Sequence, residues 1–329
     1  MAAMTKRMQA TIMGLCLAAL VLAPYDASAA REIIYGGQYY PEEFVLQGMP
    51  QLWQKYGLQV NHILFSSGAE NNQALISGAC HINVGSDSKT VELFSALEGK
   101  VVIIGVVQRG NRYATIVRSN APYKTWSDLK GKTVATRFGT GAEQVLRRYF
   151  EINGMSWKDY RWVNMKLEDM IGALQSGSIE AFTVWEPTCA IAEAKGVGRV
   201  LRSYGDISPV PVCLHTTREF AQAHRAEIVR FLAAHLDKAD LIRKNPRQAA
   251  RIAAKAAGEK GYEVSPQVFE QVFKRIDFSL EINDDALRSI RETAQFLYDN
   301  KKISRIPAIQ SDASFLEEAK ALRKKTAKP

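Results

Sequence analysis

Cysteine is scarce in this chain. Four cysteines occur in 329 residues, namely Cys16, Cys80, Cys189 and Cys213, and no two of them have Cys-x-x-Cys spacing. This argues against a zinc site or a thioredoxin-like motif. The five histidines also lack metal-ligand spacing. We therefore predict no metal site and no cofactor.

Several catalytic and binding motifs are missing as well. The chain has no phosphate-binding pattern Gly-x4-Gly-Lys-Ser/Thr and no nucleophile pattern Gly-x-Ser-x-Gly, which argues against an ATPase or an esterase-like enzyme. No dense Lys/Arg block with interleaved aromatic residues precedes the lysine-rich C-terminal tail. Nucleic acid is therefore not an expected partner.

The composition is that of a soluble globular protein, with 47% hydrophobic and 23% charged residues. The length suits two domains of ordinary size. The formal net charge is +9. Such a charge attracts an anionic ligand or an anionic membrane surface, or it serves solubility alone.

The first 29 residues have the pattern of a secretory signal peptide. Lys6 and Arg7 precede an apolar run over residues 12–22, and residues 27–29 are Ala-Ser-Ala, the small residues that a signal peptidase accepts. The run is too short to span a membrane. We predict cleavage after Ala29 or Ala30. Lipid attachment at Cys16 is disfavoured, because Leu15 precedes it where a small residue is expected.

The next part of the chain alternates between short apolar strands and amphipathic helices. Strands are expected at residues 33–35, 58–65, 80–84 and 101–107, an order that predicts a parallel sheet with helical crossovers. In open α/β sheets ligands bind beyond the carboxyl ends of the strands. The candidates at those ends are Tyr39, Tyr40, Ser66, Ser67, Ser86, Asp87 and Arg109.

A second α/β unit centres on residues 128–143. A strand over residues 133–136 feeds a helix through a Gly-Thr-Gly loop, and such a loop leaves backbone N–H groups free to hold a small ligand. The candidate residues of this loop are Arg137, Phe138, Gly139, Thr140 and Gly141.

Further strands are expected at residues 162–165, 181–184 and 197–201, a return crossing at residues 210–214, and helices beyond residue 217. Two crossings between two α/β units predict two lobes with a cleft between them. The expected boundaries are residues 1–29 for the signal peptide, 30–117 for the first part of lobe 1, 118–212 for lobe 2, and 213–329 for the completion of lobe 1 with the C-terminal helices.

Three segments carry a family resemblance. The run Asp-Leu-Lys-Gly-Lys-Thr-Val-Ala at residues 128–135, the loop at residues 138–141, and Trp-Glu-Pro at residues 185–187 resemble the solute-binding proteins of nitrate/sulfonate/taurine-type ABC transporters. The resemblance runs from about residue 33 to about residue 297. It implies a two-lobed type II periplasmic binding fold, in which each lobe has a mostly parallel sheet and the lobes close on ligand by hinge bending.

The resemblance also implies a function. A monomeric periplasmic protein would capture a small organic solute, expected to be anionic (sulfonate-, taurine- or nitrate-like, or an aromatic carboxylate), for a permease and an ATPase that are separate chains. Trp185 and Glu186 match the cleft-lining positions of that family. Alternatives are an enzyme of the same fold in pyrimidine-precursor or menaquinone biosynthesis, and a subunit that delivers its ligand to a sensor kinase.

Some side chains have two interpretations. Thr140 and Glu143 have the spacing of a capping box, whereas a ligand-contacting Glu143 would favour a ligand with a hydrogen-bond donor or a positive group. Arg109 and Arg137 would each hold a carboxylate or sulfonate if they face the cleft. Cys189 and Cys213 either form a disulfide or remain buried thiols.

Overall fold

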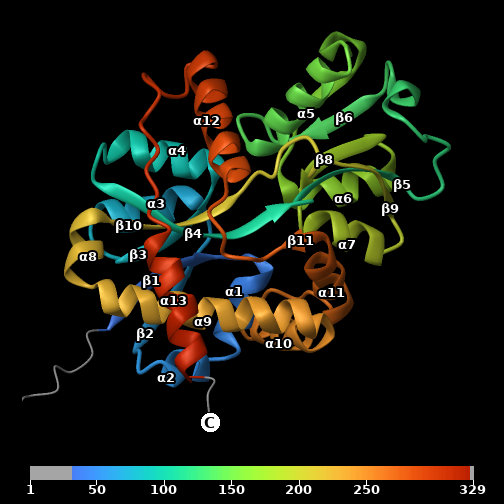
Figure 1. Cartoon of the computed structure of the whole chain (residues 1–329). Coiled ribbons are helices and arrows are strands. Elements are labelled where there is room, and N and C mark those ends of the chain that lie inside the picture. The colour runs from blue at the N-terminus through green and yellow to red at the C-terminus, as the bar shows by residue number, and fades with distance from the viewer. Residues whose placement is uncertain (1–31, 327–329) are drawn as a thin grey trace, which may run out of the picture. The chain divides into compact units, whose positions relative to one another are not determined.

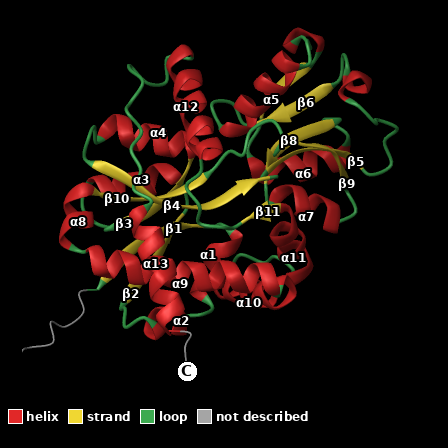
Figure 2. Cartoon of the chain, viewed as in Figure 1, coloured by secondary structure: helices red, strands yellow, loops and turns green. Residues whose placement is uncertain are grey.

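Two β-sheets organise residues 32–326, the part of the chain that the computed structural model describes (Figures 1 and 2). The predicted signal peptide lies outside these residues. The first sheet has the order β11-β4-β10-β3-β1-β2. Its strands are β1 (Ile33–Gln38), β2 (Val60–Phe65), β3 (Ile82–Ser86), β4 (Val101–Gly110), β10 (Val212–Thr217) and β11 (Ile276–Asp277).

Parallel pairing joins β1 to β2 and to β3, as the alternating sequence predicts. The strand β10 pairs antiparallel with both β3 and β4, because the chain returns to this sheet from the opposite direction. The strand β1 is longer than expected and includes Gly36 and Gly37. A Cβ atom at Gly36 would lie 2.1 Å from Asn71 Oδ1, and one at Gly37 would lie 2.5 Å from His62 Nε2. The glycines therefore give polar side chains room to approach the strand.

The second sheet has the order β7-β6-β8-β5-β9. The strand β6 pairs parallel with β7 and β8, whereas β5 is antiparallel to β8 and β9. Its strands are β5 (Tyr113–Arg118), β6 (Thr133–Thr136), β7 (Arg161–Asn164), β8 (Ala181–Trp185) and β9 (Gly198–Ser203). We assigned residues 113–117 to lobe 1, but β5 belongs to the second sheet. The lobe boundaries otherwise remain predictions.

The chain passes between the two sheets twice, as predicted. The strand β4 leads into β5 through residues 111–112, and β9 leads back to β10 through residues 204–211. The two connections run side by side. Gly110 N donates to Pro209 O at 2.8 Å, and Tyr204 N donates to Tyr113 O at 3.2 Å.

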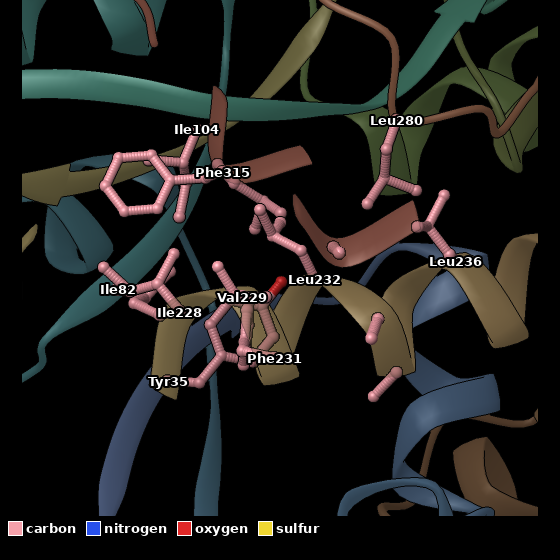
Figure 3. Packing of buried hydrophobic residues seen from close by; sticks show 14 of the residues in the cluster. Tyr35, Ile82, Ile104, Ile228, Val229, Phe231, Leu232, Leu236, Leu280 and Phe315 are labelled. Carbon is pink, nitrogen blue, oxygen red and sulfur yellow. The ribbon is translucent and has the colours of Figure 1, made fainter. Parts of the chain in front are cut away.

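Helices cover both faces of the first sheet. The strand β4 alternates between the faces, because successive side chains of a strand point in opposite directions. Val102 and Ile104 pack with α9 (Arg225–Lys244) and α13 (Ser314–Thr326), whereas Val101 and Ile103 pack with α3 (Gly68–Ile76), α4 (Asp87–Ala96) and α12 (Asp284–Asp299). Figure 3 shows Ile104 near Phe315 of α13 and above Ile228 and Val229 of α9. Burial of a large apolar side chain contributes roughly 1.5–3 kcal/mol.

The helices associated with the first sheet include all those of the C-terminal third of the chain. They are α1 (Pro41–Gln47), α2 (Gln51–Lys55), α3 (Gly68–Ile76), α4 (Asp87–Ala96), α8 (Arg218–Ala223), α9 (Arg225–Lys244), α10 (Pro246–Glu259), α11 (Pro266–Arg275), α12 (Asp284–Asp299) and α13 (Ser314–Thr326). Capping side chains and prolines in the local sequence determine where several of these helices begin. Asn245 caps α10 and Asn283 caps α12 through side-chain hydrogen bonds, and a proline opens α1, α10 and α11.

The second sheet packs against α5 (Gly141–Ile152), α6 (Leu167–Ser176) and α7 (Thr188–Ala194), with two short 3-10 helices at Trp126–Leu129 and Trp157–Asp159. The face covered by α5 is rich in aromatic residues, with Trp126, Phe150 and Tyr160 buried together. None of the helices within residues 32–326 combines the length and the apolar character that a membrane crossing needs.

The cysteines of the described residues, Cys80, Cys189 and Cys213, are buried free thiols. The disulfide interpretation is therefore wrong. Cys189 lies in α7 beside the second sheet, whereas Cys213 lies on β10 of the first sheet. Burial raises the pKa of Cys213 to about 12, which keeps it a neutral thiol.

Candidate functional site

A cavity of about 350 Å³ is lined by residues of both sheets and is here called the cleft. Four helices of nine residues or more begin at its wall, namely α3, α4, α5 and α6. The residues at these starts are Gly68, Ser86, Ser88, Gly141 and Leu167. A helix N-terminus carries partial positive charge and unpaired N–H groups. The wall therefore favours an anion.

Arg112 is a cationic side chain of the cleft that forms no salt bridge with a carboxylate of residues 32–326. Its side chain is buried, with 2% of its surface exposed. The guanidinium donates from Nε to Gln108 Oε1 at 2.7 Å and from Nη1 to Val210 O at 2.8 Å. Both hydrogen-bond partners are neutral. The buried carboxylate of Asp87 interacts with the guanidinium electrostatically, but no hydrogen bond joins the two groups, so N–H groups of Arg112 remain available to a ligand.

The partner Gln108 is itself held in one orientation. Its Nε2 donates to Glu42 Oε2 at 2.5 Å, which leaves Oε1 to face Arg112. Glu42 is fully buried in α1. Burial and the neighbouring charge of Glu43 raise the pKa of Glu42 to about 7. The order Glu42, Gln108, Arg112 thus runs from the interior of lobe 1 to the cleft.

Two aromatic groups form part of the wall. Tyr39 and Tyr262 meet edge to face with centroids 5.9 Å apart, and both contact the buried ring of Phe44. On the side of the second sheet, Trp185 packs edge to face against Tyr113 at 6.1 Å. Tyr40 also lines the cleft, and burial raises its pKa to about 12. Its hydroxyl is therefore neutral at physiological pH.

Of the described residues that line the cleft, one is acidic, namely Glu186. Both of its carboxylate oxygens have partners. Oε1 pairs with Arg275 Nη1 at 2.8 Å, and Oε2 accepts from Ala190 N at 2.9 Å. Burial raises the pKa of Glu186, and Arg275 opposes that rise. Lys89, which also lines the cleft, is paired with Glu92 at 2.6 Å.

The structure brings most of the sequence-predicted site residues together. Those that line the cleft come from both lobes and are Tyr39, Tyr40, Ser66, Ser67, Ser86, Thr140, Gly141, Trp185 and Glu186. Asp87 lies directly beneath the wall at the start of α4, and its Oδ2 accepts from Thr293 Oγ1 at 2.7 Å. Contact of these residues with a ligand remains a prediction.

Arg109 lies outside the cleft. Its guanidinium donates to Asp277 Oδ2, to Ser279 Oγ and to Glu281 O at distances of 2.5–2.7 Å. It borders a different hollow near β11. The antiparallel pairing of β11 with β4 turns this side chain away from the cleft.

The first part of the Gly-Thr-Gly loop also lies outside the cleft. Phe138, Gly139 and Glu143 line a separate hollow with residues of α12, and Phe138 is 40% exposed. Arg137 does not line the cleft, and its carbonyl accepts from Thr140 Oγ1 at 2.6 Å. The expected cradle around Gly139 is therefore not part of the cleft.

Glu143 has the capping role in a modified form. Its Oε2 accepts from Gly139 N at 2.8 Å rather than from Thr140 N, and its Oε1 pairs with Arg147 at 2.6 Å. The Thr140 hydroxyl accepts from Ala142 N at 3.3 Å. The Gly139 amide is thus already hydrogen-bonded to a side chain of α5, the helix that follows the loop. The inference from Glu143 to a ligand with a positive group loses its basis.

Sequence reasoning missed Arg112, Tyr113 and Tyr262. A signal for Arg112 was present, because it lies directly before the first strand of the second sheet and hence on a crossing between the lobes. Tyr262 follows α10, and its position depends on how the C-terminal helices pack against α1. Within residues 32–326 no group of three or more His, Cys, Asp or Glu side chains is arranged to hold a metal ion.

Comparison with known proteins gives consistent relatives. The family model described as NMT1/THI5 like matches residues 52–249. A protein of Escherichia coli named as an aliphatic sulfonates-binding protein is 27% identical over 199 residues. The match covers 60% of this chain and 62% of that relative, which is less than two thirds of its length.

Solved structures share the fold. The crystal structure of the periplasmic aliphatic sulphonate binding protein from Escherichia coli has a TM-score of 0.74 at 22% identity, covering 84% of this chain and 89% of that chain. A desulfurization enzyme has a TM-score of 0.66 at 14% identity, covering 88% and 99%. At such identities the likeness concerns the fold. It confirms the predicted two-lobed type II architecture.

Proposed function

This chain belongs to the NMT1/THI5-like family, and we propose that it is the substrate-binding component of an ABC importer that captures a small organic anion in the periplasm. The observation that carries the proposal is Arg112, a buried guanidinium at the cleft whose hydrogen-bond partners are both neutral. A sulfonate fits such a group, because guanidinium donates two parallel hydrogen bonds to an oxyanion.

The helix starts add to this preference. The positive ends of α3, α4, α5 and α6 share one wall with the hydroxyl groups of Ser66, Ser67, Ser86 and Thr140. Relatives named for sulfonate binding support the same ligand class. The permease and the ATPase would be separate chains, and the binding component would act as a monomer.

We propose binding rather than catalysis, although one structural neighbour is an enzyme. The carboxylate of Glu186 is committed to Arg275 and to the start of α7. It is therefore not poised to accept a proton from a hydroxyl nucleophile of the cleft.

A thermal-shift panel of the purified protein tests the proposal. Sulfonates, aromatic carboxylates, nitrate and pyrimidines are screened, and the bound compound is then analysed by mass spectrometry. A ligand at about one hundred times its dissociation constant adds roughly 2.7 kcal/mol to stability. We expect an organic anion to raise the midpoint and to be recovered unchanged. A midpoint unmoved by every class, or recovery of a converted product, contradicts the proposal.

Location and transport need their own measurements. We expect the protein isolated from the periplasm to begin at Ala30 or Arg31, and a cytoplasmic protein with an intact N-terminus contradicts export. We also expect a strain without this gene to lose uptake of the radiolabelled ligand. Normal uptake with loss of a ligand-dependent transcriptional response points to delivery to a sensor kinase instead.

A further inference from the structure

The aromatic wall of the cleft has a rigid backing. Tyr262 stacks on Phe44 with centroids 5.7 Å apart and an interplanar angle of 13°, and Tyr39 meets Phe44 edge to face at 5.8 Å. Phe44 is fully buried in α1, where Phe269 of α11 also contacts it. The two tyrosine rings are thus fixed before ligand binds, which lowers the entropy cost of a stacking contact.

The same cleft contains further flat and apolar surface. Trp185 lies at its wall with Tyr113 behind it, and Leu167 adds an aliphatic side chain. A volume of about 350 Å³ lies at the lower end of the range of pockets for organic ligands. An inorganic oxyanion would leave this aromatic surface without a partner.

The carboxylate that lines the cleft is already paired and is not free to bind a positive group. Of the described residues that line it, Glu186 carries the carboxylate, and only 2% of that side chain is exposed. Arg275 and the Ala190 amide take both oxygens. Arg112 adds positive charge, whereas Lys89 is paired with Glu92. An ammonium group in the cleft would lose its hydration and would meet no unpaired carboxylate among the described residues that line it, and the buried carboxylate behind the wall, that of Asp87, already interacts with Arg112.

From these features we infer that the ligand is an aromatic sulfonate without a positively charged group. The sulfonate binds Arg112 and the helix starts, and the ring packs against Tyr39, Tyr262 and Trp185. This inference rests on the proposed function and narrows it. It disfavours nitrate, short alkyl sulfonates and taurine.

Four sulfonates separate the parts of the inference by calorimetric titration. Benzenesulfonate and cyclohexanesulfonate both have a six-carbon ring, but only the ring of benzenesulfonate is flat. Ethanesulfonate and taurine differ by one ammonium group. We expect benzenesulfonate to bind at least about tenfold more tightly than cyclohexanesulfonate and ethanesulfonate. Taurine should bind about tenfold more weakly than ethanesulfonate.

Variants of Tyr262 test whether the ring of the ligand packs against this side chain. Tyr262→Leu should weaken benzenesulfonate binding about tenfold and change ethanesulfonate binding less than twofold. Tyr262→Phe retains the ring and should keep the parental affinity. Tyr298→Leu is the matched control, because Tyr298 is a 45% exposed tyrosine of α12 that does not line the cleft.

The outcomes distinguish the two proposals. If no organic anion binds, the proposed function and this inference both fail. If taurine or ethanesulfonate binds as tightly as benzenesulfonate, or if cyclohexanesulfonate equals it, the protein remains a binding component and the aromatic inference is overturned. An equal loss for benzenesulfonate and ethanesulfonate in Tyr262→Leu also overturns it.

Discussion

The corner formed by the end of β4 and the connection to β5, residues 109–112, and the loop between β6 and α5, residues 137–140, both contribute to the cleft. The charged side chains at these two places have different kinds of partner. At the corner, Arg112 is held by the neutral groups Gln108 Oε1 and Val210 O. At the loop, Glu143 is paired with Arg147 and with the Gly139 amide. A charge held by neutral partners is available to a ligand, whereas a charge held by an opposite charge serves the fold.

The largest expected effect tests the corner. Arg112→Met should weaken benzenesulfonate binding at least about 30-fold, since the loss of one partner of a buried charge contact costs about 2–5 kcal/mol. Arg109→Met should change affinity less than twofold, because Arg109 is bonded to Asp277, Ser279 and Glu281 outside the cleft.

Calorimetry measures both variants, and thermal unfolding shows that each one is folded. Arg112→Lys retains the charge without the planar fork and should be intermediate in affinity. If Arg112→Met binds benzenesulfonate with the parental affinity, Arg112 does not contact the ligand and the prediction is wrong.

The second prediction separates the two glycines of the loop. A Cβ atom at Gly141 would lie 2.6 Å from Tyr113 Oη, so Gly141→Ala should displace this cleft-lining ring and weaken binding about tenfold. Gly139 has a φ of +72° and an open surrounding, with Lys302 Cε 3.8 Å from the added Cβ. Gly139→Ala should therefore cost about 1 kcal/mol of stability and leave affinity within twofold.

Urea unfolding and calorimetry of this pair measure stability and affinity separately. A larger affinity loss in Gly139→Ala than in Gly141→Ala would restore the Gly139 amide as a ligand contact.

The third prediction concerns the buried acid behind the corner. Burial and the charge of Glu43 raise the pKa of Glu42 from 4.5 to about 7 in the folded state. Between these values the folded state binds the proton more strongly than the unfolded state, so this group makes stability fall as pH rises from 4.5 to 7. Glu42→Gln removes that dependence and can still accept a hydrogen bond from Gln108.

Urea midpoints between pH 4.5 and 7.5 should show the variant gaining stability relative to the parent as pH rises. Glu32→Gln, at an exposed glutamate just before β1, is the matched control and should follow the parent. Parallel profiles for Glu42→Gln and the parent would show that Glu42 titrates normally.

The smallest effect concerns the loop. Glu143→Gln weakens the pair with Arg147, whose side chain is 41% exposed, and removes a negative charge from the first turn of α5. We expect a loss of about 1 kcal/mol in the free energy of unfolding and a change in affinity below twofold. An affinity change above about fivefold would show that the charge of Glu143 acts on the bound ligand, contrary to this prediction.

Much of the fold was predictable because its signals are local. The apolar strands and amphipathic helices alternate along the sequence, and the polar residues Ser66, Ser86 and Thr140 lie at strand ends or within four residues after them. In a parallel sheet the strand ends meet at one edge, so Ser66 and Ser86 could be placed near one another without coordinates, whereas Thr140 could be placed only at the facing edge of the second sheet. Departures such as β1 continuing through Gly36 and Gly37 came from side chains distant in sequence that need the space.

The charges of the site were decided by tertiary structure. The sequence by itself determined that arginines stand at positions 109, 112 and 137 near strand ends. Which of them serves the cleft depends on partners far along the chain: Arg109 is drawn away by Asp277 and Ser279, and Arg112 is fixed by Val210. Those pairings follow from how β11 and the second crossing pack beside β4, and local periodicity carries no information about contacts about one hundred residues apart or more.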